Sequence, residues 1–236
     1  MTVTSGITGI AVIIPAHNEE ENLPRTLRAV MTSAACTPVP VHVVVVLDKT
    51  DDGSDLLAGE YGSDVHFVSV EAGNVGAARA AGYTYAATLC PDDERTWYAA
   101  TDADTLVDTD WLIRQLDAEA DMVLGVVRIA DSRRVPIPVL RRYLRGYKKG
   151  TEGAHTHVHG ANMGFRADAY WAVGGFRALP TGEDVELVER FEAAGYQIHR
   201  DSALSVATSA RKEGRAPDGF AAHLRSLSPP AARDSA

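Results

Sequence analysis

The sequence predicts an α/β fold with a mostly parallel central sheet and helices on both of its faces. Four short apolar runs rich in β-branched residues indicate buried strands, at 9–14, 41–48, 65–70 and 96–101. Helical patterns lie between them. One opens at 18–21 and places Leu23, Leu27, Val30 and Met31 at helical spacing, and an Ala-rich one spans 74–89. Strands that are apolar on both faces and alternate with helices are typical of a parallel sheet covered on both sides.

Composition excludes several classes of protein. The chain has 236 residues, of which 45% are hydrophobic, so it can bury one large core. A net charge of −9 argues against a general nucleic-acid-binding surface. Only Cys36 and Cys90 occur, and no apolar stretch approaches the ~20 residues of a membrane helix. We therefore expect a cytoplasmic protein without a transmembrane segment and without a nucleic-acid partner.

One local stretch is strongly basic in spite of the acidic total. Its members are Arg133, Arg134, Arg141, Arg142, Arg145, Lys148 and Lys149. A solvated helix face explains such a run, and a face toward phosphate or a membrane surface is the alternative. The second interpretation leaves room for a peripheral position at a membrane.

Polar residues follow the ends of the predicted strands. Pro15 to Asn18 follow the first strand, Asp48 ends the second, and Asp102 to Asp104 follow the fourth. In parallel α/β sheets ligands bind beyond the carboxyl ends of the strands, so these residues should converge at one edge. An isolated Asp-x-Asp has another explanation, because acidic residues also favour the N-terminus of a following helix, here at Trp111.

Several motifs occur in the order seen in family 2 glycosyltransferases of the GT-A type, and the chain resembles that family over roughly residues 10 to 200. They are VIIPAHNEEENLPRTLRAV, VVVVLDKTDDGSD, GNVGAARAAG, TDADT, HGANMGFRADAYWAVGGF and GEDVELVERFEAAGYQI. The resemblance implies a GT-A fold and an inverting enzyme. It also implies a nucleotide-sugar-binding half at 1–105 and an acceptor-binding half at 106–227, and we expect a disordered tail at 228–236.

The resemblance also implies a donor site. Asp104 would bind Mg²⁺ or Mn²⁺ directly, and Asp102 would face the ribose or a metal-bound water; carboxylate oxygens suit either ion. Asp48 would accept from the base, and Arg79 would approach the diphosphate. Other residues expected to line this site are Pro15, Ala16, Asn18, Glu19, Ala103, Gly160, Ala161 and Asn162. Asp48 and Arg79 also have simpler explanations. Asp48 could cap a loop, and Arg79 could pair with Glu71.

A second acidic pair provides the predicted base. Gly182 precedes Glu183 and Asp184, which open a helix whose apolar positions Val185, Leu187, Val188 and Phe191 should point inward. Taken alone, this is a helix N-terminus with favourable charges. In the family it resembles, the Asp deprotonates the acceptor hydroxyl, so Asp184 is the expected general base and Glu183 its support. A base opposite the leaving group gives inversion at the anomeric carbon.

Two histidine features need separate treatment. His155, His157 and His159 alternate, so on a strand they would share one face, where zinc or a place near the acceptor are the two interpretations. Family members often supply a further metal-binding His after the last strand, but no His lies between His199 and His223. Water, Thr208, Ser209 or the diphosphate would then complete the metal shell, and Arg211, Lys212 and Arg215 would form a basic lid over the diphosphate.

The predicted function is therefore metal-dependent, inverting transfer of a sugar from a UDP- or GDP-sugar to a small or lipid-linked hydroxyl acceptor. A nicotinamide dehydrogenase is disfavoured because GNVGAARAAG follows the third strand and lacks the Gly-x-Gly-x-x-Gly order. A nucleotidyltransferase-like enzyme would need a Gly-rich basic loop where PAHNEEEN stands. A non-catalytic nucleotide-sugar-binding protein remains the alternative from another class, and the presence of Asp184 argues against it.

Overall fold

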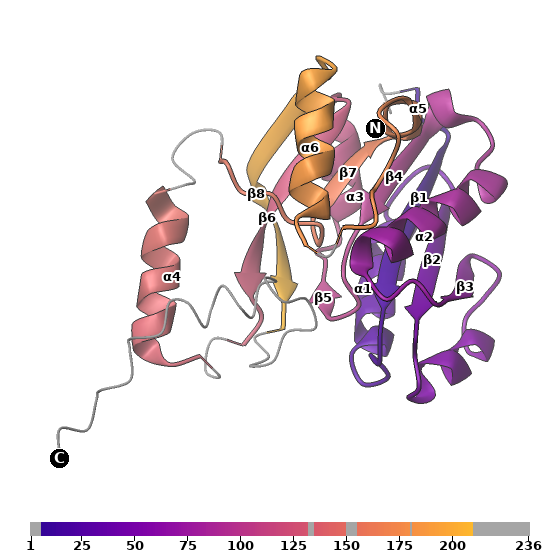
Figure 1. Cartoon of the computed structure of the whole chain (residues 1–236), viewed down its shortest axis with the longest axis horizontal. Helices are drawn as coiled ribbons and strands as arrows, with labels where there is room; N and C mark the ends of the chain where they lie inside the picture. The colour runs from indigo at the N-terminus through magenta and orange to yellow at the C-terminus, as the bar shows by residue number, and fades with distance from the viewer. Residues whose placement is uncertain (1–5, 132–134, 150–154, 180, 210–236) are drawn as a thin grey trace.

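The fold is described from a computed structural model that covers residues 6–131, 135–149, 155–179 and 181–209. Strands and helices alternate through its first half (Figure 1): β1 (Gly9–Ala16), α1 (Leu23–Ala35), β2 (Val41–Asp48), the 3₁₀ helix η1 (Gly53–Gly59), β3 (Val65–Val70), α2 (Val75–Leu89), η2 (Asp93–Arg95) and β4 (Thr96–Ala100). The four strands predicted from the sequence are all present.

The second half is less regular. It contains β5 (Thr105–Leu106), α3 (Trp111–Asp117), β6 (Met122–Ile129), α4 (Ile137–Lys149), β7 (Met163–Arg166), α5 (Ala167–Ala172), α6 (Glu183–Ala193) and β8 (Ile198–Thr208). Figure 1 shows α4 standing beside this half, away from the other helices. The hydroxyl of Tyr143 on α4 donates to the carbonyl of Val127 on β6 at 2.7 Å and fixes the helix to the sheet.

The described strands form one sheet in the order β3-β2-β1-β4-β7-β6-β8-β5. The pairs β1–β2, β2–β3, β1–β4 and β6–β8 are parallel, whereas β7 is antiparallel to both of its neighbours and β5 is antiparallel to β8. The predicted α/β class with a mostly parallel sheet is therefore confirmed. The carboxyl ends of β1, β2 and β4 lie at the same edge.

Two apolar cores lie on opposite faces of the sheet. Alternate residues of β1 divide between them: Ile10, Val12 and Ile14 face the core under α1 and α3, and Ala11 and Ile13 face the core under α2, α5 and α6. The period-two geometry of a strand requires both sets to be apolar when both faces are covered. This explains the unbroken apolar runs in the sequence.

Three local expectations need correction. The first helix begins at Leu23 rather than at 18–21, because Asn18 adopts a left-handed φ of 54° and residues 17–22 form a turn first. Val185 on α6 was expected to point inward but is 44% exposed, and Met31, at helical spacing with the apolar residues of α1, is 38% exposed. Both occupy the edge of an apolar stripe, where helical spacing alone does not decide burial.

Candidate active site

The turn after β1 is joined to the loop after β2. The amide of Asn18 donates to the Asp51 carboxylate and its carbonyl oxygen accepts from the Asp51 N–H at 2.9 Å. Glu19 is buried, its backbone N–H donates to Ser54 Oγ at 3.1 Å and its carboxylate accepts from Asn22. Pro15 and Ala16 end β1 beside these residues. These hydrogen bonds hold the turn in place at the sheet edge where the sequence predicts that the nucleoside binds.

Asp48 at the end of β2 is also buried, and its Oδ1 accepts from the backbone N–H of Gly73 at 2.9 Å. Gly73 has a left-handed φ of 70° and precedes α2. One carboxylate oxygen of Asp48 therefore caps the loop before α2, as the simpler interpretation expected. A carboxylate has further lone pairs, so this contact leaves acceptor capacity for a ligand.

Arg79 joins the two acidic motifs of the sequence. It is 3% exposed on α2, and its guanidinium donates from Nη2 to Asp102 Oδ1 at 2.7 Å and from Nη1 to Glu183 Oε1 at 2.5 Å. The expected alternative partner, Glu71, is not among its contacts. The guanidinium also lies over the ring of Phe176, 5.5 Å from its centroid. The positive charge of Arg79 lies between Asp102 and Glu183, so these two acids can lie close together without strong repulsion.

Arg79, Asp102 and Glu183 form a triad, in which burial and charge have opposite effects on the pKa values of Arg79 and Glu183. Burial raises the pKa of Glu183, and the guanidinium of Arg79 acts against that effect. For Arg79 burial disfavours the charged form, but the carboxylates of Asp102 and Glu183 outweigh it and raise the pKa of Arg79. Arg79 is therefore a fixed positive charge, and Glu183 is committed to holding it.

Two glycines allow this close packing. A Cβ on Gly160 would lie 2.6 Å from the guanidinium of Arg79, and one on Gly76 would lie 2.2 Å from the carbonyl of Arg177. Both distances are far below van der Waals contact. Neither Gly76 nor Phe176 was singled out from the sequence, and no local pattern could have done so, because their partners lie elsewhere in the chain.

Asp104 contacts the end of strand β8. Thr208 at the end of β8 places its hydroxyl 3.5 Å from Asp104 Oδ1, and the Ser209 N–H donates to the Asp104 carbonyl at 3.3 Å. Ala103 between the two acids is buried, and its carbonyl accepts from the Thr26 hydroxyl at 2.8 Å. Thr208 and Ser209, which the sequence offered as metal ligands, are thus beside Asp104.

The donor set suits a hard divalent ion only in part. Asp102 and Asp104 supply carboxylate oxygens, the ligands that Mg²⁺ and Mn²⁺ prefer. Within the residues that the structure describes, no group of three His, Cys, Asp or Glu side chains could hold a metal ion. Mg²⁺ is commonly bound by one or two carboxylates together with water and substrate phosphates. The two acids therefore fit an ion that arrives with a diphosphate.

Asp184 is held by two backbone amides. Its Oδ2 accepts from the Gly160 N–H and its Oδ1 from the Val185 N–H, each at 2.8 Å. Gly182, with a φ of 73°, is the residue before the helix and lets the chain turn into α6. The half-buried carboxylate is thus fixed in orientation beside the Arg79 triad.

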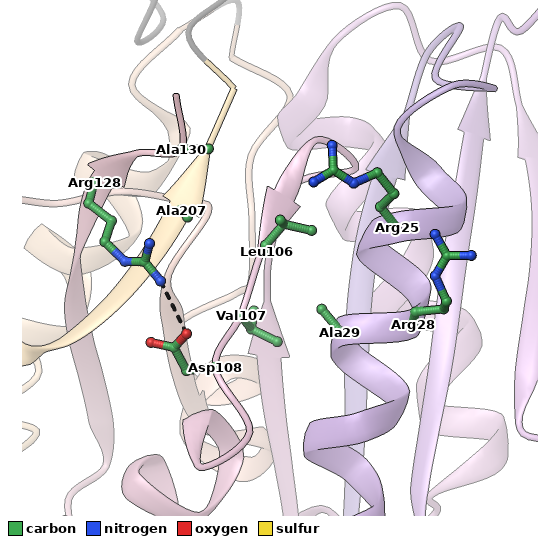
Figure 2. Close-up of a pocket in the computed structure, with 9 residues that line it drawn as sticks. All are labelled: Arg25, Arg28, Ala29, Leu106, Val107, Asp108, Arg128, Ala130 and Ala207. Carbon is green, nitrogen blue, oxygen red and sulfur yellow. Dashed lines mark hydrogen bonds and ion pairs between the residues drawn. The ribbon is translucent and has the colours of Figure 1, made fainter. Parts of the chain in front are cut away.

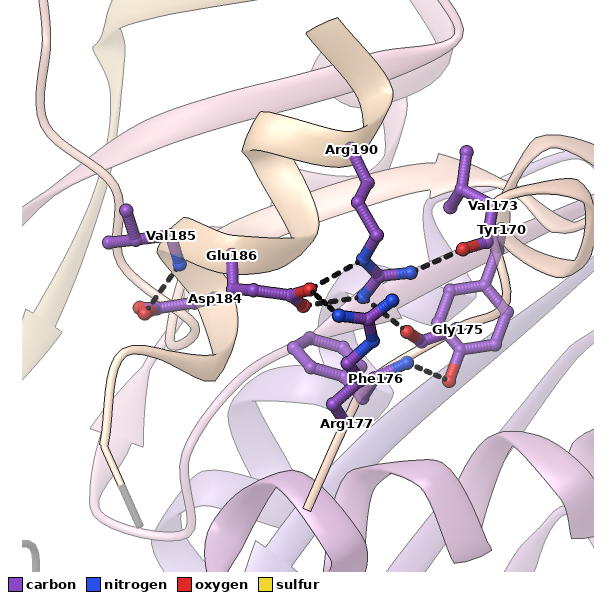
Figure 3. Close-up of polar contacts among 9 residues, drawn as sticks. All are labelled: Tyr170, Val173, Gly175, Phe176, Arg177, Asp184, Val185, Glu186 and Arg190. Carbon is purple, nitrogen blue, oxygen red and sulfur yellow. Dashed lines mark hydrogen bonds and ion pairs between the residues drawn. The ribbon is translucent and has the colours of Figure 1, made fainter. Parts of the chain in front are cut away.

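Arg190, in the last turn of α6, joins this helix to the segment that follows α5 (Figure 3). Arg190 binds both oxygens of Glu186, at 2.9 and 2.7 Å, and donates to the carbonyls of Val173 and Gly175. The next residue, Phe176, donates its N–H to the Tyr170 hydroxyl at 3.0 Å. Arg190 therefore holds α6 against the turn that carries Phe176, the residue whose ring lies under the Arg79 guanidinium.

Asn162 does not point into this site. Its side chain is fully buried, donates to the carbonyls of Val126 and Leu204 at 2.9 Å each, and accepts from Trp111 Nε1 at 2.9 Å. The expected contact of this amide with a sugar is not supported, because its hydrogen bonds connect β6, β8 and α3. Gly160 remains at the site through its backbone N–H, which donates to Asp184, whereas Ala161 is buried in the core under α1 and α3.

The three alternating histidines do not lie on a strand. Residues 155–159 have no regular secondary structure, although the rings stack at centroid distances of 6.0 and 5.8 Å. His155 is fully buried, its Nε2 lies 3.0 Å from the Leu124 carbonyl, and burial lowers its pKa. Among the described side chains, these rings belong to no group that could hold a metal ion.

Some predictions fall outside the described residues. These are the lid at Arg211, Lys212 and Arg215, the basic pair Arg133 and Arg134, and the tail at 228–236. Of the helices that the structure describes, none is both long enough and apolar enough to cross a bilayer.

The family model for glycosyl transferase family 2 matches residues 11–174. The chain belongs to this family. Its fold is similar to that of TarS 1–349 from S. aureus in complex with UDP-GlcNAc, with 15% identity and a TM-score of 0.65 over 93% of this chain and 65% of that one. It is also similar to the mannosyltransferase PcManGT from Pyrobaculum calidifontis in complex with GDP-Man and Mn²⁺, with 20% identity and a TM-score of 0.61.

That second match covers 87% of this chain and 58% of PcManGT, so the chain spans less than two thirds of either relative. No curated protein matches the sequence. At these identities the structural likeness concerns the fold. Both similar proteins are GT-A-like, and the expected fold class is therefore confirmed.

Proposed function

We propose that this family 2 member transfers a sugar from a nucleotide-diphosphate donor to a hydroxyl acceptor, with inversion and with the help of Mg²⁺ or Mn²⁺. The observation that carries the proposal is the Arg79 bridge, which brings the Asp-x-Asp at 102–104 and the Glu-Asp pair at 183–184 to one site. Residues 81 positions apart along the chain, Asp102 and Glu183, share one guanidinium. The similar proteins that contain UDP-GlcNAc and GDP-Man support a donor of this class.

The roles of the residues follow from their contacts. Asp184 would accept the proton of the acceptor hydroxyl, since two backbone N–H groups orient its carboxylate and leave other lone pairs available. Glu183 would hold Arg79, and Arg79 would hold Asp102 in place. Asp48 and the turn at 15–19 would bind the nucleoside.

Asp102 and Asp104 would hold the divalent ion, which when bound neutralises the negative charge that develops on the leaving diphosphate. Few other ligands come from the described part of the chain, so the diphosphate and water would supply the rest of the shell. Nucleotide and metal should therefore bind together. UDP and GDP are both compatible with this site, and the acceptor would be a small or lipid-linked hydroxyl compound, the latter reached from a peripheral position at a membrane.

A thermal-shift panel of UDP, GDP and dTDP, each with Mn²⁺ or EDTA, tests the donor site. A ligand at about 100 times its Kd stabilises the folded state by roughly 2.7 kcal/mol. At ~2–4 °C per kcal/mol, we expect at least one nucleotide to raise the Tm by several degrees in Mn²⁺. Asp104→Asn should abolish that shift, while Asp117→Asn, an exposed acid at the end of α3, should not. Equal shifts in Mn²⁺ and EDTA would contradict the metal role.

A further inference from the structure

A recess, drawn in Figure 2, lies on the face of the sheet that carries α1, opposite the face that carries α2 and α6. It has a volume of about 450 Å³ and lies between α1, β5 and the ends of β6 and β8. Its apolar floor comes from Ala29, Leu106, Val107 and Ala207. Val107 belongs to the core under α1 and α3, whereas the triad belongs with α2 and α6. Small-molecule sites commonly have volumes of ~300–1,000 Å³.

The walls of this recess are basic although the chain as a whole is acidic. Arg25 reaches in from α1, Arg128 lies across the gap on β6, and Arg28 lies further along α1 (Figure 2). Arg25 and Arg28 are exposed and form no ion pair with a described residue. Arg128 has one carboxylate partner, Asp108, at 3.1 Å, and both side chains are at least half exposed. The guanidinium groups of Arg25 and Arg128 thus border the recess beside its lining carboxylate, Asp108, whereas that of Arg28 points away from it (Figure 2).

We infer that this recess binds a phosphate-bearing ligand. The planar guanidinium forms paired hydrogen bonds to phosphate oxygens, and Arg25 and Arg128 present this group from opposite walls. The floor of alanine, leucine and valine side chains accommodates a small apolar part of the same ligand. A soluble phosphate ester and the headgroup of an anionic lipid share this chemistry. The inference rests on the recess alone and is independent of the proposed transfer reaction.

Asp108 provides a distinguishing consequence. The Asp108 carboxylate accepts a hydrogen bond from Arg128 Nη2, so it would compete with a phosphate for this group. Removing its charge should strengthen phosphate binding. A purely structural role of the Arg128–Asp108 pair predicts no such gain.

Calorimetric titration with pyrophosphate in EDTA tests the site without involving a metal-dependent nucleotide site. Arg25→Gln and Arg128→Gln should each weaken binding roughly tenfold, since a hydrogen bond to a charged group contributes ~1.5–3 kcal/mol. Asp108→Asn should tighten it about two- to fivefold. Arg95→Gln removes an equally exposed charge at the end of η2 and should change nothing. Equal binding by the parent and the Arg25 and Arg128 variants would overturn the inference, as would an equal loss in Arg95→Gln.

A vesicle arm identifies the source of the phosphate. Vesicles of phosphatidylglycerol in phosphatidylcholine are mixed with the same variants and sedimented. Sedimentation that requires Arg25 and Arg128, with pyrophosphate binding weak, assigns the site to a lipid headgroup. Tight pyrophosphate binding without sedimentation assigns it to a soluble phosphate compound. If neither probe depends on these arginines, the recess is an ordinary solvated surface and the inference fails.

Discussion

Replacing Asp184 with Asn should abolish sugar transfer and leave the donor site intact. The change preserves the size of the side chain, and an amide oxygen can still accept from the Gly160 or Val185 N–H. It removes the carboxylate that we propose takes the proton of the acceptor hydroxyl. Loss of a positioned base typically lowers the rate by ~10² to 10⁴. Turnover is therefore expected to fall by that factor, with the nucleotide Kd within about twofold of the parent.

Glu189→Gln is the matched control, because Glu189 is an exposed acid on the same helix. Its turnover and Kd should equal those of the parent. Should Asp184→Asn retain turnover within a few-fold, Asp184 is only a helix-terminal acid. The base would then have to be sought elsewhere at the site.

Replacing Arg79 with Met should cost the fold about 3–5 kcal/mol, because it leaves the buried carboxylate of Glu183 and the half-exposed one of Asp102 without their shared cation. The methionine fills much of the space under Gly160 and over Phe176, so the loss reports mainly charge. Urea unfolding measures the change as a shift of the midpoint at constant slope. Nucleotide binding should weaken in parallel, since Asp102 loses its positioning contact.

Two further variants separate this effect from simple loss of packing. Arg177→Met breaks the pair between the exposed Arg177 and the partly buried Glu186, which keeps Arg190 as a partner, and should change the free energy of unfolding by less than about 1 kcal/mol. The double variant Arg79→Met, Glu183→Leu should recover a large part of the stability lost in Arg79→Met, because the buried charge is then absent. A loss below about 1 kcal/mol in Arg79→Met would show that the bridge is not a buried clamp.

The first half of the fold could be predicted because its signals are local. The apolar runs of β1 to β4 extend over whole strands, and strands covered on both faces need no alternation to be recognised. The beginning of α1 was misplaced by several residues, since Asn18 and Glu19 have the composition of a helix N-terminus but bind the 51–54 loop instead. A helix boundary that depends on another loop carries no local signal.

The acidic residues of the site could be predicted from the sequence, but their connection through one guanidinium could not. The acids at 102–104 and 183–184 stand out by type and position, but the guanidinium that joins them comes from a helix 104 residues before Glu183. Asn162 shows the opposite error. An amide that connects β6, β8 and α3 is indistinguishable in sequence from one that binds a sugar. Such roles depend on contacts between distant segments.

The anomeric configuration of the product tests the central claim most directly. The donor selected by the nucleotide panel is incubated with Mn²⁺ and a set of hydroxyl acceptors, and proton NMR follows the sugar. One base at Asp184 and a diphosphate leaving from the opposite face predict a single displacement, so the sugar should appear on the acceptor with inverted configuration. A product that retains the configuration of the donor would contradict the assignment of Asp184 as the base of an inverting transfer.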